Sequence, residues 1–148
     1  MPESATQVDV TRVFDAPREA VFAAFTDPEQ VMQWWGPEHF DVPRDSVTID
    51  LREGGRYDLT MVQTGSGQEF PVRQEILEVS SPELLILRHE PMPDFGMLEA
   101  IDTRIEFHDE GGATRVEITS GPYSAEMGPN AQTGWEQQFD KLAGLLSA

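Results

Sequence analysis

Three histidines are the side chains of this chain best suited to moving a proton near neutral pH. They are His39, His89 and His108. No two of them stand at a spacing such as i, i+4 that would place both on one metal ion. His89 shares a strand phase with Leu85 and Leu87, so we expect it to point inward at the mouth of a cavity, either as a hydrogen-bonded rim residue or as a catalytic base. His39 and His108 are expected in a loop and on a solvent-facing strand position.

Other catalytic patterns are missing from the sequence. There is no cysteine, no serine in a nucleophile-elbow context, and no glycine-rich phosphate loop. If acid–base chemistry occurs, we expect Glu90, His89 or Arg12 near it. Arg12 shares a strand phase with apolar neighbours, so it either reaches out to water or faces an internal cavity. We therefore assign no catalytic residue, no metal ligand and no cofactor.

The charge balance restricts the partners. The chain has 148 residues, 27 acidic against 10 basic side chains, and a formal net charge of −17. Such a field repels nucleic acid and anionic membranes, so we expect neither as a partner. No apolar run is long enough to span a bilayer, and the polar residues 1–6 are unlike a signal peptide. We expect a cytoplasmic protein with one domain over residues 1–148 and a flexible tail over residues 1–6.

Sequence periodicity predicts the order of the elements. Residues 8–14 alternate as a strand. Asp15-Ala16-Pro17 is expected to start a helix, with Pro17 in its first turn. Asp27 can cap a second helix, in which Gln30 completes a capping-box pattern, before it stops at Gly36-Pro37. Residues 42–119 then alternate with a period of two between short turns rich in glycine. Consecutive hairpins of this kind indicate an antiparallel meander, which twists and curls.

The last segment, residues 130–146, has the clearest one-sided pattern. Trp135, Phe139, Leu142 and Leu146 are spaced by four, three and four residues, which predicts one apolar helical stripe. Asn130 is the expected N-cap. A curled sheet needs cover on its concave face, and this helix has enough apolar surface to supply it. The sequence therefore predicts an α+β fold in which about six or seven strands wrap around a long C-terminal helix, with two short helices after the first strand.

Large apolar and sulfur-containing side chains are candidates for the space between sheet and helix. Methionine adapts its shape to varied apolar ligands, so these residues either line a ligand cavity or simply fill the core. The Pro- and Met-rich residues 91–97, together with the loop at Met127, are expected to form the entrance. The candidates are Trp35, Phe40, Tyr57, Met61, Phe70, Leu87, Met92, Met97, Met127, Trp135 and Phe139, with His89 at the rim.

Three stretches carry a resemblance to a known family. The first runs from Arg12-Val13-Phe14-Asp15-Ala16-Pro17 through Thr26-Asp27-Pro28-Glu29 to Trp34-Trp35-Gly36-Pro37; the second is Asp50-Leu51-Arg52-Glu53-Gly54-Gly55-Arg56-Tyr57; the third combines Gly134-Trp135 with Leu142-Ala143-Gly144-Leu145-Leu146. In this order they resemble the START-like (SRPBCC) superfamily. Within it, the chain is similar to the group related to the C-terminal domain of the activator of the heat-shock-protein ATPase.

The resemblance implies the helix-grip, or Bet v-like, fold and a range of functions. Similar proteins include lipid carriers, polyketide cyclases and stress-linked ligand binders. Similar sequences often have a glycine where this chain has Gln74, so that side chain is added to the expected cavity wall.

Three functions follow as expectations. The first is a non-enzymatic module that binds a small hydrophobic molecule between sheet and helix. The second is an enzyme of the polyketide cyclase or hydratase type that uses the same cavity. The third is an interaction protein that activates a chaperone ATPase, and it is placed last because nothing in this sequence corresponds to the extra N-terminal domain of the eukaryotic co-chaperone. The sequence leaves a homodimer open.

Overall fold

The computed structural model describes residues 6–36, 38–93, 99–123 and 127–146. Of the expected tail, only Thr6 falls in this part, where it begins the first strand. The elements are β1 (Thr6–Phe14), α1 (Arg18–Thr26), α2 (Pro28–Trp34), β2 (Phe40–Asp41), a 3₁₀ turn (Arg44–Ser46), β3 (Thr48–Ile49), β4 (Arg56–Gln63), β5 (Glu69–Ser80), β6 (Leu84–His89), β7 (Ile101–Asp109), β8 (Thr114–Tyr123) and α3 (Met127–Leu146).

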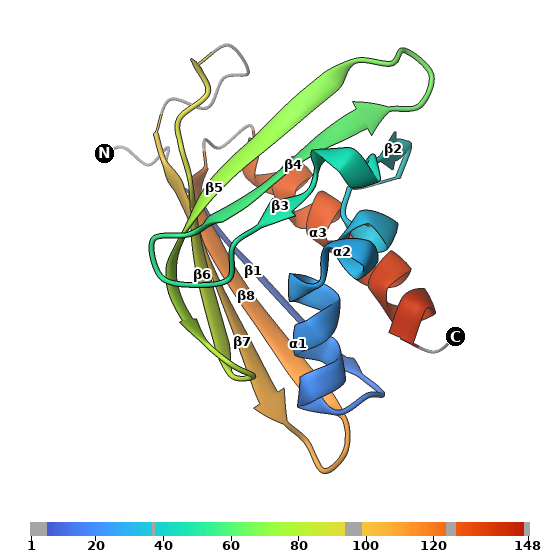
Figure 1. The fold of residues 1–148 in the computed structure, drawn as a ribbon, viewed down its shortest axis with the longest axis vertical. Coiled ribbons are helices and arrows are strands. Elements are labelled where there is room, and N and C mark those ends of the chain that lie inside the picture. Colours follow the sequence, from blue (N-terminus) through green and yellow to red (C-terminus); the bar gives the residue numbers. More distant parts are fainter. Residues whose placement is uncertain (1–5, 37, 94–98, 124–126, 147–148) are drawn as a thin grey trace.

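The strands form one curled antiparallel sheet. In the described residues, seven strands follow one another in the order β1-β8-β7-β6-β5-β4-β2, and the short β3 pairs with β4 beside this row. Figure 1 shows the sheet curving as a half-barrel, with α3 crossing its open side and α1 and α2 covering one part of it. The predicted α+β helix-grip fold is therefore confirmed.

One predicted strand is much shorter than expected. The alternation over residues 47–51 predicts a strand, but only Thr48–Ile49 pairs with β4. A tight turn ends the pairing: a Cβ atom on Gly55 would lie 2.0 Å from the Asp50 carbonyl oxygen, so only glycine fits there. The chain then reverses directly into β4. At the other end of the sheet, β8 continues beyond the expected Thr119 to Tyr123, where it pairs with Thr6.

The two short helices begin close to where the sequence predicts. Asp27 caps α2, because its Oδ1 accepts a hydrogen bond from the Glu29 amide at 3.1 Å and Pro28 occupies the first position. Gln30 does not complete a capping box; its Nε2 donates to the Asp27 carboxylate instead. Pro17 is the N-cap residue of α1 and precedes its first turn.

The last helix starts earlier than expected. It begins at Met127, so Asn130 lies inside the first turn and is not the N-cap. Pro129 is tolerated there because the first amides of a helix have no intrahelical acceptor. The predicted apolar stripe is confirmed, since Trp135 is 7% exposed and Phe139 and Leu142 are fully buried. At 20 residues, α3 is about 30 Å long.

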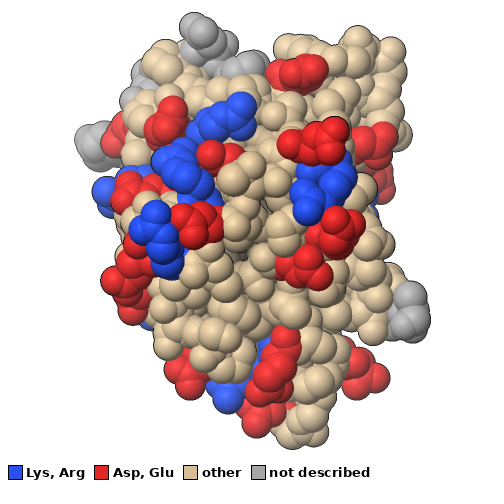
Figure 2. All heavy atoms as spheres, in the orientation of Figure 1, with Lys and Arg blue, Asp and Glu red and all other residues tan. Residues whose placement is uncertain are grey.

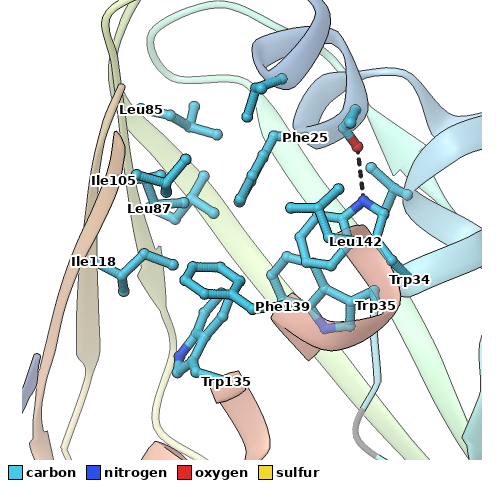
Figure 3. Close-up of a cluster of buried hydrophobic side chains, with 14 of the residues drawn as sticks. Phe25, Trp34, Trp35, Leu85, Leu87, Ile105, Ile118, Trp135, Phe139 and Leu142 are labelled. Atoms are coloured by element: carbon cyan, nitrogen blue, oxygen red, sulfur yellow. Dashed lines mark hydrogen bonds between the residues drawn. The ribbon is translucent and has the colours of Figure 1, made fainter. Parts of the chain in front are cut away.

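The core lies under the second half of α3. Figure 3 shows Leu85, Leu87, Ile105 and Ile118 projecting from the strands toward Phe25, Phe139 and Leu142. The neighbouring tryptophans Trp34 and Trp35 are both buried, and only Trp35 also lines the cavity described below. Helix α2 ends at Trp34, whose Nε1 donates a hydrogen bond to the Ala24 carbonyl at 2.8 Å. Trp35 follows in an extended conformation, which turns its ring toward Trp135.

Charges of both signs are interspersed on the surface. Figure 2 shows arginines lying among Asp and Glu side chains, with no separate basic patch on that face. In residues 6–36, 38–93, 99–123 and 127–146, no helix has the length and apolar character that a membrane crossing requires.

Candidate functional site

A cavity of about 300 Å³ lies between the sheet and the first half of α3. This volume is at the lower end of the range for small-molecule sites. Its wall comes from β4, β5, the end of β6 with the segment at Met92, β7, β8, the loop at Trp35 and one face of α3. The lining residues are Trp35, Met61, Phe70, Pro71, Val72, Gln74, His89, Met92, Ile101, Thr103, Tyr123, Asn130, Ala131, Gly134, Trp135 and Gln138.

Strand and helix periodicity position this wall. Inward positions of β5 and β7 alternate with outward ones, which places Val72 beside Gln74 and Ile101 beside Thr103 on the same face. On α3, Ala131, Trp135 and Gln138 are spaced by four and three residues and so face the cavity together. Small residues on that face leave room that larger side chains would fill.

Two tryptophans and a ring of soft side chains make the cavity mainly apolar. The rings of Trp35 and Trp135 meet edge to face, with centroids 5.5 Å apart. Met61 and Phe70 face them from the β4–β5 hairpin, where the two residues are directly opposed in the register. An apolar molecule placed here would contact aromatic and thioether groups, which adapt well to different shapes.

Three hydroxyl groups form a chain at one side of the cavity. Thr103 Oγ1 lies 2.8 Å from Ser120 Oγ, and Ser120 Oγ lies 2.9 Å from the Tyr123 hydroxyl. Thr103 and Ser120 are buried, and both ends of the chain line the cavity. Burial raises the pKa of the Tyr123 hydroxyl, with smaller opposing effects from the Ser120 and Trp135 side chains. The hydroxyls are therefore neutral donors and acceptors.

Two buried glutamines complete the polar part of the wall. Gln138 Oε1 accepts a 2.6 Å hydrogen bond from the Gly36 amide, which ties α3 to the loop after α2. Gln74 Nε2 donates to the Tyr57 carbonyl at 3.4 Å. These contacts fix the orientation of each amide, because an N–H must face a carbonyl oxygen.

His89 lies on the wall but both of its ring nitrogens are occupied by backbone groups. Nε2 accepts a hydrogen bond from the Arg73 amide at 3.2 Å, so the ring proton is on Nδ1, which lies 2.7 Å from the Glu90 carbonyl oxygen. A neutral imidazole held in this way has no lone pair for a substrate. The rim-histidine interpretation is thus favoured over the catalytic base.

The other acid–base candidates lie outside the cavity wall. Arg12 pairs with Asp140 of α3 at 2.8 Å and lies 5.8 Å from the centroid of the Phe139 ring. Its guanidinium neither reaches freely into water nor lines the cavity. Glu90 is exposed, and its nearest cation is Arg56 at 3.9 Å.

The predicted site residues fall into three groups. Trp35, Met61, Phe70, Gln74, His89, Met92 and Trp135 come together on the cavity wall. Phe40 packs against Phe70 from behind, with ring centroids 5.6 Å apart. Tyr57, Leu87 and Phe139 are fully buried in the core; the Tyr57 hydroxyl donates to the Phe25 carbonyl, and burial raises its pKa. Met97 and the side chain of Met127 lie outside the described residues.

Sequence reasoning missed part of the wall. Thr103 shares an inward strand phase with Ile101 and Ile105, and Gln138 lies three residues after Trp135 on the helix. In both cases a polar residue occupies a position that the pattern assigns to the interior, and this could have identified them. The missed residues are Pro71, Val72, Ile101, Thr103, Tyr123, Asn130, Ala131, Gly134 and Gln138.

One group in the described part of the chain brings three potential metal ligands together, on the outer face of the sheet. Ligand atoms of Glu106, His108 and Glu117 lie within 4.8 Å of one another. Each carboxylate is already paired through its other oxygen, Glu106 with Arg104 and Glu117 with Arg115. The Arg104 hydrogen bond is the main cause that lowers the pKa of Glu106. We interpret the group as a surface ion-pair network that lies apart from the cavity.

Solved structures with the same architecture come from several bacteria. A protein from Chromobacterium violaceum is 26% identical with a TM-score of 0.87, covering 96% of this chain and 97% of that one. The AHSA1 protein from Silicibacter pomeroyi is also 26% identical, with a TM-score of 0.83 and coverages of 96% and 98%. An AHSA1-like protein from Aeromonas hydrophila, 20% identical with a TM-score of 0.79 and coverages of 96% and 92%, shares the fold.

A family model extends over nearly the whole sequence. The model described as Activator of Hsp90 ATPase homolog 1-like protein matches residues 15–147. No curated protein matches the chain. The matched residues include the short helices, every strand of the sheet except β1, and α3, and so all the elements that line the cavity. The chain therefore belongs to the Activator of Hsp90 ATPase homolog 1-like family.

Proposed function

We propose that this protein binds a small hydrophobic molecule in the cavity between its sheet and α3. The observation that carries the proposal is the cavity itself, roofed by Trp35 and Trp135 and lined mainly by apolar side chains. An engineered cavity of about 150 Å³ admits benzene. A cavity of about 300 Å³ has twice that volume and suits a molecule of roughly two or three rings.

The wall supports binding rather than catalysis. Its described residues include no Asp, Glu, Lys or Arg, and its histidine is held by the backbone on both nitrogens. A cyclase or hydratase needs a group that can exchange a proton with the substrate. Neutral amides and hydroxyls instead suit the orientation of a bound molecule.

Activation of a chaperone ATPase is the second candidate, because the family model carries that description. A docking surface of this kind usually exposes a contiguous apolar patch. Among the described residues, the large apolar side chains classed as exposed are Val13 at 54% and Leu51 at 41%. This supports ligand binding in the internal cavity over docking through an external apolar surface. We propose that the protein acts in the cytoplasm and that its partner is the small molecule.

Filling the cavity tests the proposal. Ala131→Phe places a ring in the space from α3, whereas Thr133→Phe adds the same ring two residues further on, at an exposed position. The probe is N-phenyl-1-naphthylamine, a neutral dye that fluoresces in apolar surroundings. We expect the wild type and Thr133→Phe to enhance its fluorescence and Ala131→Phe to lose at least tenfold in affinity.

Two results would contradict this function. An absence of enhancement by the folded wild type would remove the binding site, and equal enhancement by Ala131→Phe would place the dye elsewhere. Native mass spectrometry of protein purified from its own host provides an independent measurement, since a bound physiological ligand adds a discrete mass.

A further inference from the structure

Some hydrogen-bond donors and acceptors on the cavity wall have no partner within the described part of the protein, and they indicate which polar groups a ligand carries. This inference rests on the proposed function, because it names the class of molecule that the same cavity takes. The relevant groups are the hydroxyl chain and the two glutamines, whose orientations are set by hydrogen bonds within the protein that use only some of their donors and acceptors.

The hydroxyl chain leaves one O–H donor at an end of the chain. Three hydroxyls carry three protons, and the two links Thr103–Ser120 and Ser120–Tyr123 use two of them. If both outer hydroxyls donated to Ser120, the Ser120 proton would be buried with no acceptor in the described part of the chain, at a side chain only 1% exposed. The remaining proton therefore belongs to Thr103 or Tyr123, and both line the cavity.

Gln138 supplies a second donor. Its Oε1 is taken by the Gly36 amide, and the contacts between described residues give its Nε2 no acceptor. No side-chain nitrogen or oxygen that is fully buried in this part of the structure lacks a partner. Nε2 is therefore the accessible end of a residue that is 6% exposed overall and lies on the cavity wall. An unpaired N–H at this place calls for an acceptor from the bound molecule.

Charge excludes the most common acceptor of metabolites, the carboxylate. A carboxylate that leaves water needs a cation or several strong donors. The described residues of the wall include no lysine and no arginine, and the formal net charge of the chain is −17. The donors on offer are neutral, so they match a neutral acceptor such as a carbonyl or ether oxygen.

We propose that the cavity selects neutral, oxygen-bearing apolar molecules, in which a carbonyl-type acceptor meets the Gln138 amide or the free hydroxyl of the Thr103–Ser120–Tyr123 chain. Gln74 adds an acceptor, because its Nε2 is bonded to Tyr57 and its Oε1 has no donor among the described residues. A ligand hydroxyl can use that oxygen. Free fatty acids and aromatic acids are rejected.

Three probes of one skeleton test this selectivity. They are tetralin, 1-tetralone and 1,2,3,4-tetrahydronaphthalene-1-carboxylate, and quenching of the tryptophan fluorescence reports binding because Trp35 and Trp135 line the cavity. One added hydrogen bond is worth about 0.5–1.5 kcal/mol, so we expect the ketone to bind up to about tenfold more tightly than the hydrocarbon. The carboxylate should bind more weakly than either.

A matched pair of variants identifies the donor. Gln138→Glu keeps an oxygen for the Gly36 amide but replaces the Nε2 donor by a carboxylate oxygen, so it should remove most of the preference for ketone over hydrocarbon. Gln137→Glu makes the same change one residue earlier on α3, where Oε1 holds the Glu38 amide at 3.0 Å and the side chain does not line the cavity. That variant should keep the wild-type preference.

The outcomes separate this inference from the proposed function. If tetralin binds as tightly as the ketone, or the carboxylate binds best, the selectivity is overturned while the binding function stands. Equal loss of preference in both glutamate variants would also overturn the assignment of Gln138. If none of the three probes binds, the proposed function itself is overturned.

Discussion

The two halves of α3 face the same sheet but meet it in different ways. The half with Phe139 and Leu142 is packed against Leu85 and Ile105, all of them fully buried. The half with Ala131 and Trp135 faces an open volume of about 300 Å³. Both halves have an apolar stripe, so helix character does not distinguish them. The difference comes from what else covers the sheet.

The short helices fill one half only. Phe25 of α1 meets Phe107 of β7 edge to face, with ring centroids 5.2 Å apart, and packs at a tilt against Trp34 of α2, with centroids 4.7 Å apart. Figure 3 shows Phe25 and Trp34 in the space beside Phe139 and Leu142 of the second half of α3. Toward the first half of α3, the long strands β4 and β5 extend past the short helices and leave that space unfilled. A close-packed protein interior has few voids larger than a water molecule, so an opening of this size is the region where we propose that the ligand binds.

The largest expected effect comes from a comparison of two truncations, one in the packed half of α3 and one in the wall of the cavity. Phe139→Ala empties a fully buried position, and such Phe→Ala changes cost about 3–5 kcal/mol of unfolding free energy. Met61→Ala removes a half-buried side chain from the wall of an existing cavity, so it should cost about 1 kcal/mol. Urea denaturation measures both.

This comparison fails if the two variants lose similar stability. Equal losses would mean that the first half of α3 is as tightly packed as the second, and that the cavity does not persist in solution. A larger loss in binding of N-phenyl-1-naphthylamine by Met61→Ala than by Phe139→Ala, measured where both are folded, would sharpen the division.

Sequence patterns predicted the fold well because the fold depends on periodicity. The stripe of Trp135, Phe139 and Leu142 and the alternation in β6 and β7 each require only that apolar residues recur at the right interval. The order of hairpins then gives the antiparallel sheet. The start of α3 was wrong by three residues, because Asn130 is a good cap residue but Pro129 can equally lie within the first turn.

The site was harder to predict, since core and cavity residues obey the same pattern. Leu87 and Ile101 are both inward-facing and apolar, yet only Ile101 lines the cavity. Which one does so depends on how far α1 and α2 reach across the sheet, which is a property of the assembled fold. Thr103 and Gln138 were missed because polar side chains at inward positions look like interruptions of the stripe.

Replacing Lys141, the one lysine of the sequence, tests whether the cavity region and the packed region under α3 unfold separately. Lys141 Nζ donates to the Gly36 carbonyl at 2.9 Å and to the Phe40 carbonyl at 3.3 Å, so it anchors the loop that carries Trp35 to α3. Desolvation lowers the pKa of this amine, opposed by the charges of Asp41 and Glu38. Hydrogen bonds to charged groups contribute about 1.5–3 kcal/mol, and we expect Lys141→Met to lose an amount near the lower end.

Where Lys141→Met loosens the structure is more informative than how much stability it loses. Amide hydrogen exchange should accelerate over residues 38–40, in the loop that Lys141 anchors, and remain slow around Leu85 and Ile105, which face the packed half of α3. Arg44→Met is the control, because it breaks an exposed pair with Glu29 and leaves the loop anchors in place. Uniform acceleration across the sheet would show that the two halves unfold as one unit.

The smallest expected effect is at the ion pair that fastens α3 to the edge strand. Arg12 and Asp140 approach to 2.8 Å, but their side chains are 33% and 71% exposed, and pairs of this kind contribute between about 0 and 1 kcal/mol. Arg12→Met should therefore lower the free energy of unfolding by less than about 1 kcal/mol, even though the guanidinium also lies over the Phe139 ring. The loss should shrink at high salt, because screening already weakens the pair in the wild type. A loss above about 2 kcal/mol that salt does not reduce would mean that the packed half depends on this charge, and that hydrophobic packing alone does not explain the difference between the two halves of α3.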